Sequence, residues 1–252
     1  MNDAHPAGAF APLDVRVARK AFHAASGERL EVLDDIAFTL RQGEVGAIVG
    51  PSGCGKTTML RIIAGLDRDY DGAIARPPDG KLGMVFQEPR LLPWRTVDDN
   101  VRLVAPAIAP DELAALFEVL GLAGHRAHYP GELSLGLARR VALARAFAVK
   151  PELLLLDEPF VSLDQALAAR LRDELVTLVD RYAVITLLVT HDIEEAAALA
   201  DRLILLSARP ARMLADLPIA TPRRSRTAAE VAAVKAQVTD RLVALGQPAV
   251  MA

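Results

Sequence analysis

Hydrophobic positions in the second half of the chain alternate between two kinds of segment. Short, continuous apolar runs are each followed by a longer stretch in which apolar residues recur every three or four positions. The first kind is typical of a strand buried on both faces of a sheet, and the second of an amphipathic helix that covers it. The segments with these patterns are residues 153–156, 165–182, 184–189, 193–200 and 202–206. Their alternation predicts a mostly parallel sheet with helices on both faces, an α/β fold.

The first half of the chain contributes further strands and a helical region. Strands are predicted over 13–18, 36–40, 45–49 and 81–86, and a helix over 56–64. From residue 88 to about 140 the pattern becomes helical and is interrupted by prolines, with Asp111 predicted to cap a helix over 112–120. After Leu206, one short strand and one amphipathic helix over 228–245 are expected, and the helix is predicted to pack against the domain. Residues 1–12 are predicted to form a loose tail.

Composition and charge limit the class of protein. Of the 252 residues, 52% are hydrophobic and only 4% are aromatic, which suits helices packed on a parallel sheet. The longest apolar stretches are far shorter than the roughly 20 residues that cross a bilayer, and the first residues do not resemble a secretory signal. The single cysteine, Cys54, excludes an internal disulfide and is interpreted as a packing residue. A net charge of -3 gives no indication of nucleic-acid binding, so no nucleic-acid partner is expected. Three arginines cluster near the C-terminus and are predicted to form a solvated surface turn: Arg223, Arg224 and Arg226.

A glycine-rich loop between the strand over 45–49 and the helix over 56–64 is the clearest chemical signal. It matches G-x-x-x-x-G-K-[ST] with Gly50, Pro51, Ser52, Gly53, Cys54, Gly55, Lys56 and Thr57, and Thr58 follows it. Small residues let the backbone N–H groups point at phosphate oxygens, and the helix N-terminus adds positive potential. Lys56 is predicted to contact the β- and γ-phosphates of ATP, and the Thr57 hydroxyl to be a ligand of Mg²⁺.

An acidic pair about a hundred residues later completes the predicted site. Asp157 and Glu158 follow the apolar run 153–156, so they are expected at the carboxyl edge of the sheet. Asp157 is predicted to hold the metal, and Glu158 to act as the general base that polarises the attacking water. Such a pair alone could merely cap the next turn, but together with the phosphate loop it predicts nucleotide hydrolysis.

Four further segments narrow the class. Residues 132–140 (Glu-Leu-Ser-Leu-Gly-Leu-Ala-Arg-Arg) resemble the ABC signature segment, and residues 161–164 resemble the D-loop. Residues 190–192 resemble the switch histidine, and residues 85–88 the Q-loop. In this order they are similar to the ABC ATPase pattern over roughly 22–206. The resemblance implies a P-loop ATPase domain over 13–220 with an N-terminal antiparallel β subdomain and an inserted helical subdomain over about 88–145, followed by a linker and helix over 221–252.

The resemblance also implies roles for single residues. Gln87 would contact the Mg²⁺ and the attacking water, and His191 would hydrogen-bond the γ-phosphate. Ser134 and Gly136 would face a nucleotide held by a second copy, so two chains would pair. Leu135 and Leu137 stand where the family usually has Gly and Gln, which puts the polar contacts of that Gln in doubt. Taken singly, Gln87 could be a surface residue, His191 a helix-start residue and Ser134 an ordinary N-cap.

An aromatic residue near the start resembles the position that stacks on adenine. Phe22 could supply this π-face, with His23 as the rival, and a Phe in the core or on the surface is the alternative.

Residues 86–97 look like the Q-loop region of ATP-binding subunits of nitrate, sulfonate and taurine importers. The resemblance implies that residues 87–97 form a docking surface for a membrane permease, which works with a periplasmic solute-binding protein. Trp94 would then be an apolar anchor of that surface, and packing inside the helical subdomain is the alternative. The implied location is the cytoplasmic face of the inner membrane. A lipid-trafficking ABC ATPase is the nearest alternative, and a non-transport ABC ATPase is the more distant one.

Overall fold

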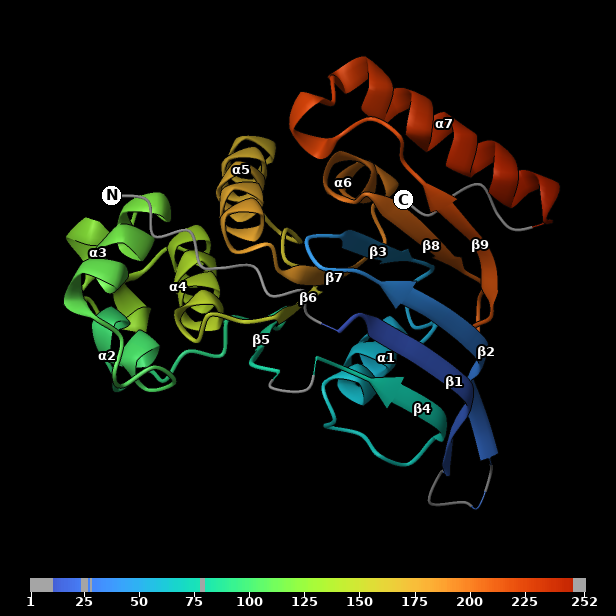
Figure 1. Ribbon diagram of the computed structural model, residues 1–252, viewed down its shortest axis with the longest axis horizontal. Helices are drawn as coiled ribbons and strands as arrows, with labels where there is room; N and C mark the ends of the chain where they lie inside the picture. The colour runs from blue at the N-terminus through green and yellow to red at the C-terminus, as the bar shows by residue number, and fades with distance from the viewer. Residues whose placement is uncertain (1–10, 24–26, 28, 78–79, 247–252) are drawn as a thin grey trace.

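The computed structural model describes residues 11–23, 27, 29–77 and 80–246 and contains two sheets (Figure 1). The larger, six-stranded sheet has the order β5-β6-β7-β3-β8-β9, and only its edge strand β9 is antiparallel. Its strands are β3 (Val45–Val49), β5 (Leu82–Val85), β6 (Leu153–Asp157), β7 (Ile185–Thr190), β8 (Arg202–Leu206) and β9 (Met213–Pro218). The predicted α/β fold with a mostly parallel sheet is confirmed.

The smaller sheet is antiparallel and has the order β2-β1-β4. It consists of β1 (Leu13–His23), β2 (Arg29–Leu40) and β4 (Asp71–Ala75). β1 and β2 are longer than the predicted strands because they also pair with each other along their outer halves, where most residues are exposed. β4 was not predicted: its residues are mostly exposed, so it shows no apolar run.

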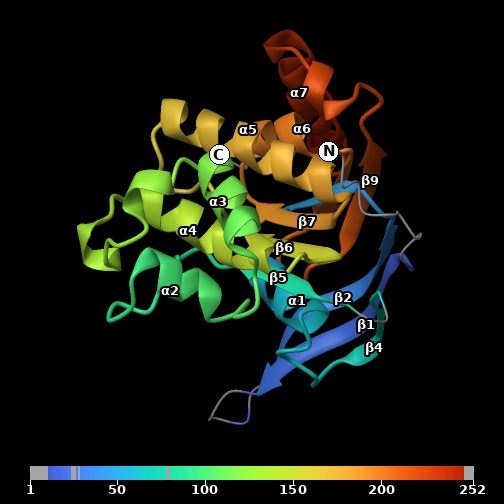
Figure 2. The same ribbon diagram turned by 60° about the vertical axis from the view of Figure 1, so that its left-hand side comes forward.

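The parallel sheet separates two hydrophobic cores because alternate side chains of a strand point to opposite faces. On one face, Leu154 and Leu156 of β6 belong to the core shared with α4 (Leu135–Ala148), α5 (Gln165–Tyr182) and α6 (Ile193–Leu199). On the other face, Leu153 and Leu155 pack in the core shared with α1 (Lys56–Ile63) and the antiparallel sheet. Figure 2 shows α5 and α6 on one side of the sheet and α1, β1 and β2 on the other.

Helices α2 (Val97–Arg102), α3 (Pro110–Val119) and α4 form a helical lobe beyond the β5 edge of the sheet (Figures 1 and 2). The prediction that Asp111 caps a helix here is wrong. α3 begins at Pro110 with Ala109 as its N-cap, and Asp111 lies inside the first turn. Proline is favoured at the first helical position, where its fixed φ suits the helix and its missing N–H costs nothing.

The C-terminal helix α7 (Ala228–Ala244) packs against α6, as predicted, and buries Val238 and Leu242. Within the described part of the chain, no helix is both long enough and apolar enough to cross a membrane.

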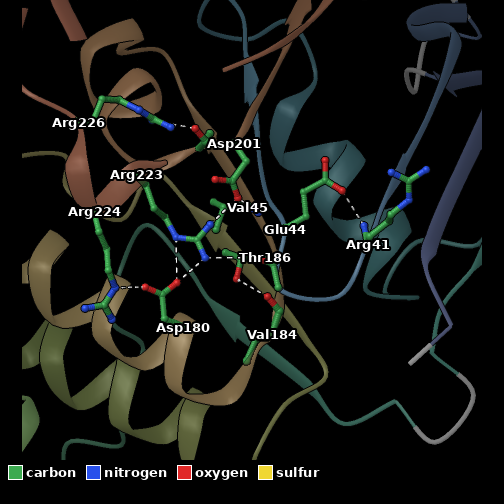
Figure 3. A network of polar contacts seen from close by, with 12 residues as sticks. Arg41, Glu44, Val45, Asp180, Val184, Thr186, Asp201, Arg223, Arg224 and Arg226 are labelled. Atoms are coloured by element: carbon green, nitrogen blue, oxygen red, sulfur yellow. Dashed lines mark hydrogen bonds and ion pairs between the residues drawn. The ribbon is translucent and has the colours of Figure 1, made fainter. Parts of the chain in front are cut away.

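The segment before α7 does not form the predicted solvated arginine turn. Arg223 is only 12% exposed and lies between Asp180 and Asp201, with both of which it forms ion pairs (Figure 3). Its Nη2 also donates to the Gly43 carbonyl at 3.1 Å. Arg226 donates to the carbonyl of Ala200 at 2.9 Å. The partners come from distant parts of the chain, so the charge run alone does not indicate them.

Candidate functional site

Three neighbouring strand ends bring the predicted catalytic residues together. β7 lies between β3 and β6, and the three strands are parallel, so their carboxyl ends meet at one edge of the sheet. The phosphate loop follows β3, Asp157 ends β6, and His191 follows β7. The sheet order therefore makes neighbours of residues that are far apart in the sequence.

Glycines set the course of the loop between β3 and α1. Gly53 and Gly55 have φ angles of 73° and 125°, which side-chain-bearing residues rarely adopt. A Cβ on Gly55 would also lie 2.8 Å from side-chain atoms of Val32 and Leu33. The loop can take this course only because these two positions are glycine.

Lys56 is nearly buried and lies against the loop that it follows. Its Nζ donates to the carbonyls of Gly50 at 2.7 Å and Pro51 at 3.1 Å. Ser52 and Gly53 are exposed, and Pro51 and Thr58 are half-buried. The Cys54 side chain points into the core, where burial raises the pKa of its thiol. Its interpretation as a packing residue is confirmed, so only the backbone of Cys54 remains available to a phosphate.

Thr57 and Asp157 form an oxygen pair across the sheet edge. The Thr57 hydroxyl donates to Oδ1 of Asp157 at 3.1 Å. Burial raises the pKa of Asp157, and the hydrogen bond from Thr57 opposes this effect. A hydroxyl beside one carboxylate is the kind of donor set that Mg²⁺ uses when phosphates complete its coordination. The two residues therefore fit a nucleotide-bound Mg²⁺.

Glu158 lies beside two groups that could act with it. Its Oε1 lies 3.9 Å from Lys56 Nζ and 3.2 Å from Nδ1 of His191. The geometry of the second contact does not make a hydrogen bond, so Nδ1 of His191 is buried without a partner among the described residues. A carboxylate, an ammonium and an imidazole thus converge beside the phosphate loop, at the carboxyl ends of β6 and β7.

Ser134 and Gly136 begin α4 and are not hydrogen-bonded to the phosphate loop of their own chain within the described residues. Ser134 is exposed and is the N-cap of α4, accepting from Leu137 N at 3.3 Å. Gly136 is buried, and a Cβ there would lie 2.5 Å from the Leu167 side chain. The exposed helix N-terminus is therefore available to an anion from outside this chain.

Gln87 and Phe22 are both exposed. Gln87 follows β5, and its side chain has no hydrogen-bond partner among the described residues. Phe22 is 43% exposed, and Lys20 Nζ lies 4.6 Å from the centroid of its ring. Phe22 is therefore a surface residue and not a core residue. His23, the alternative, is exposed beside it.

The segment after Gln87 is fixed by two residues whose roles were not predicted. Asn100 is fully buried and bonds both the N–H and the carbonyl of Leu92, as well as the carbonyl of Arg95. Arg145 donates to the carbonyls of Pro89 and Arg90 at 2.9 and 2.8 Å. The sequence gives only a weak signal for these two roles: Asn100 and Arg145 are polar residues that lie next to buried apolar residues in their helices.

Trp94 lies on this fixed segment and is 71% exposed. The alternative that it packs inside the helical lobe is wrong.

Two other residues near the site were also missed. Glu195 accepts a hydrogen bond from the Thr190 hydroxyl at 3.0 Å, and burial raises its pKa. Arg139 is buried on α4 and reaches the backbone of the Glu158 loop. Arg139 lies within the segment 132–140, but no role was predicted for it, and Glu195 belongs to no motif. The hydrogen-bond partners of both residues can be identified only from the folded structure.

Comparison with known proteins places this geometry in a family. The ABC transporter family model matches residues 33–161. The chain is 40% identical over 246 residues to the aliphatic sulfonates import ATP-binding protein SsuB 2 of Burkholderia cenocepacia, covering 93% of this chain and 89% of that protein. It is 43% identical over 241 residues to SsuB 1 of Pseudomonas aeruginosa, covering 89% and 94%.

Solved structures agree. The dimeric structure of MJ0796, a bacterial ABC transporter cassette, superposes with a TM-score of 0.72 at 27% identity, covering 83% of this chain and 100% of that one. A post-hydrolysis state of the same cassette, bound to ADP and Pi, superposes with a TM-score of 0.66 at 29% identity, covering 81% and 99%. This chain belongs to the ABC transporter family and is an ATP-binding, ATP-hydrolysing protein of that family.

Proposed function

We propose that this chain powers an importer of aliphatic sulfonates or of a related small anion such as nitrate or taurine. The observation that carries the catalytic part is the convergence of Lys56, Glu158 and His191 at one sheet edge. The names of the relatives, which are import proteins for aliphatic sulfonates, support the transported class. No observation favours a lipid-trafficking role.

In this proposal ATP is held by the backbone of residues 50–57, with Lys56 on the β- and γ-phosphates. Thr57 and Asp157 would hold Mg²⁺, and Gln87 would contact the same metal and the attacking water. The metal, when bound, supplies charge neutralisation to the phosphates. Phe22 stacks on the adenine, because it offers an exposed aromatic face at the end of β1.

Hydrolysis in this proposal depends on two side chains. The carboxylate of Glu158 accepts a hydrogen bond from the attacking water and draws its proton away as the water approaches the γ-phosphate. His191 lies beside this carboxylate and donates a hydrogen bond to the γ-phosphate. The position of Nδ1 near Oε1 of Glu158 supports this pairing of roles.

Two copies act together in the proposed complex. The exposed N-terminus of α4, with Ser134 and Gly136, covers the nucleotide held by the other copy, so each copy completes the other's site. The dimeric state of the structural relative supports this arrangement. Closure of the pair would move a membrane permease docked on residues 87–97, at the cytoplasmic face of the inner membrane, and a periplasmic solute-binding protein would deliver the anion.

The test is the Glu158→Gln variant of the full chain. It keeps the size and packing of the side chain but removes the base, so turnover should fall by about 10²-fold or more while ATP affinity stays within about twofold. Because ATP is bound but not hydrolysed, the variant should also accumulate as an ATP-dependent dimer in sedimentation. Unchanged turnover would refute the base assignment, and a monomer at saturating ATP would refute the pairing.

A further inference from the structure

Arg139 is a buried cation with no carboxylate partner among the described residues. It is 5% exposed, and its guanidinium donates to three backbone carbonyls, those of Glu158 at 3.3 Å, Pro159 and Val161. Its Nε is buried and has no hydrogen-bond partner in the part of the chain that the structure describes. Burial lowers the pKa of Arg139, and the more distant Glu195 only partly offsets this. Burying a cation without a carboxylate partner costs free energy, and here only the hydrogen bonds to backbone carbonyls offset this cost.

The backbone that Arg139 holds is itself strained. Glu158 and Ser162 have φ angles of 44° and 64°, in the left-handed region that non-glycine residues rarely adopt. Such residues persist only where the surroundings fix them, and they concentrate at functional sites. On its other side, the Glu158 N–H donates to the Val189 carbonyl of β7 at 2.9 Å. The peptide groups around Glu158 are thus fixed from β7 on one side and from α4 on the other.

We propose that Arg139 is a positioning residue for Glu158: its guanidinium holds the carbonyls of residues 158, 159 and 161 and thereby keeps the Glu158 carboxylate beside His191 and Lys56. The proposal rests on the proposed role of Glu158 as the base. Arg139 touches neither the nucleotide nor the reacting atoms, so it acts only through the loop that it bonds.

The same contact links two parts of the site. α4 begins at Ser134 and Gly136, which are proposed to face the nucleotide of the other copy, and Arg139 lies on the same helix. A displacement of α4 is therefore transmitted through three hydrogen bonds to the backbone of Glu158. This contact makes the position of the base depend on whether the N-terminus of α4 is engaged.

Arg140, the next residue, provides a matched control. It also bonds α4 to another element, through a bidentate pair with Glu174 on α5 at 2.8 and 2.9 Å. Both arginines are mostly buried, but within the described part of the chain Arg140 makes no hydrogen bond or ion pair with residues 158–162. Replacing either arginine removes a contact between α4 and another element. Only replacement of Arg139 removes hydrogen bonds to the backbone of residues 158–162.

The experiment measures kcat and ATP affinity for Arg139→Met, Arg139→Lys and Arg140→Met in the full chain. A shift of about 1 Å in a catalytic group can cost about 10²-fold in rate, so Arg139→Met should lose about 10²-fold in kcat with ATP affinity within about twofold. Arg139→Lys keeps a cationic donor but not the planar guanidinium, so its kcat should lie between those of wild type and Arg139→Met. Arg140→Met should keep kcat within about threefold, although it unfolds at a lower temperature.

A second readout separates positioning from general stability. Arg139→Ala leaves a space the shape of the guanidinium, so added guanidinium ion at millimolar concentration should restore part of its kcat and none of any loss in Arg140→Ala. If Arg139→Met does not fold, Arg139→Gln, which keeps two N–H donors, takes its place. Wild-type kcat in any folded Arg139→Met or Arg139→Gln variant overturns the inference.

The outcome is distinguishable from failure of the proposed function. If Glu158→Gln keeps turnover, the base assignment itself is wrong. If Glu158→Gln abolishes turnover while the Arg139 variants match Arg140→Met, only the positioning role of Arg139 is wrong.

Discussion

Single glycines determine the shape of the phosphate loop at the residue scale. Gly55 combines a φ of 125° with a close approach to Val32 and Leu33, so a side chain there meets both a backbone and a packing conflict. Gly124 lies in a short 3₁₀ turn over Ala123–His125, and its φ is not positive. A Cβ added there would meet no atom of the described residues within 4 Å. The two glycines therefore differ in both of the features that make glycine necessary.

Gly55→Ala is expected to weaken ATP binding by at least about tenfold and Gly124→Ala to leave it unchanged. The cost at Gly55 is the strain of a left-handed non-glycine residue, about 1–3 kcal/mol, and it falls on the loop that is proposed to contact the phosphates. Titration with a fluorescent ATP analogue measures both variants. Equal affinities for the two would contradict the role given to the loop conformation.

The predictability of site residues depends on where their partners lie. The phosphate loop and the acidic pair could be identified from the sequence because strand, loop and helix follow one another locally. Arg139 and Asn100 could not, because they bond backbone carbonyls of segments that come near only after folding. A carbonyl has no residue identity, so no sequence motif records such a partner.

At the scale of elements, the attachment of α7 depends on more than its apolar face. A capping box between Thr227 and Glu230 starts the helix, and Arg223 just before it bonds Asp180 at the end of α5 and Asp201 before β8. The Asp201 carboxylate also accepts from Val45 N at 2.9 Å. The segment is therefore fastened to the parallel sheet at the amino ends of its strands, the edge opposite to the nucleotide site.

Arg223→Ala should destabilise the fold by about 2 kcal/mol or more, because it removes the mostly buried cation that Asp180 and Asp201 share and leaves Asp180 with only the exposed Arg224. Arg224, which also bonds Asp180 but is 60% exposed, is the matched control, and Arg224→Ala should cost less than about 1 kcal/mol. Urea unfolding monitored by circular dichroism measures both. Equal midpoints for the two variants would show that the buried network adds no stability.

The same network predicts a dependence on acid. Burial would raise the pKa of Asp180, but hydrogen bonds from Arg224 and Arg223 outweigh it and hold the pKa below its ordinary value. A depressed carboxyl pKa stabilises the fold above the unfolded pKa of about 3.9, and this contribution is lost as pH falls through the folded pKa. The stability gap between wild type and Arg223→Ala should therefore narrow below about pH 4.

Element boundaries were predictable where apolar runs are bounded by local signals. The helix over Gln165–Tyr182 and the strands over Val45–Val49 and Arg202–Leu206 have the predicted bounds. The strands are buried apolar runs, the helix has one buried apolar face, and each element is bounded by polar or turn residues. β4 and the outer halves of β1 and β2 were missed because most of their residues are exposed and form no continuous apolar run. Their backbone pairing with neighbouring strands, which the sequence does not record, orders them.

At the scale of the whole molecule, the nucleotide site and the proposed docking surface are joined by a short, rigid segment. Gln87 follows β5, and Trp94 lies a few residues later, before α2. Asn100 and Arg145 fix the backbone between them. A permease bound at Trp94 would therefore act on a segment that is already ordered. A displacement of Trp94 by the permease would move Gln87 as well, because hydrogen bonds fix the backbone between the two residues.

Trp94→Ala is expected to weaken association with the cognate permease by at least about tenfold, because an exposed tryptophan on a fixed segment has the character of an interface hot spot. The ATP affinity and thermal stability of the isolated chain should not change, since Trp94 is 71% exposed. Leu66→Ala is the control: its side chain is 58% exposed but follows α1, outside residues 87–97. Quantitative co-purification with the permease measures all three proteins. If Trp94→Ala and Leu66→Ala retain the permease equally, the permease binds elsewhere. In that case the proposal that it acts on the nucleotide site through Trp94 and Gln87 is refuted.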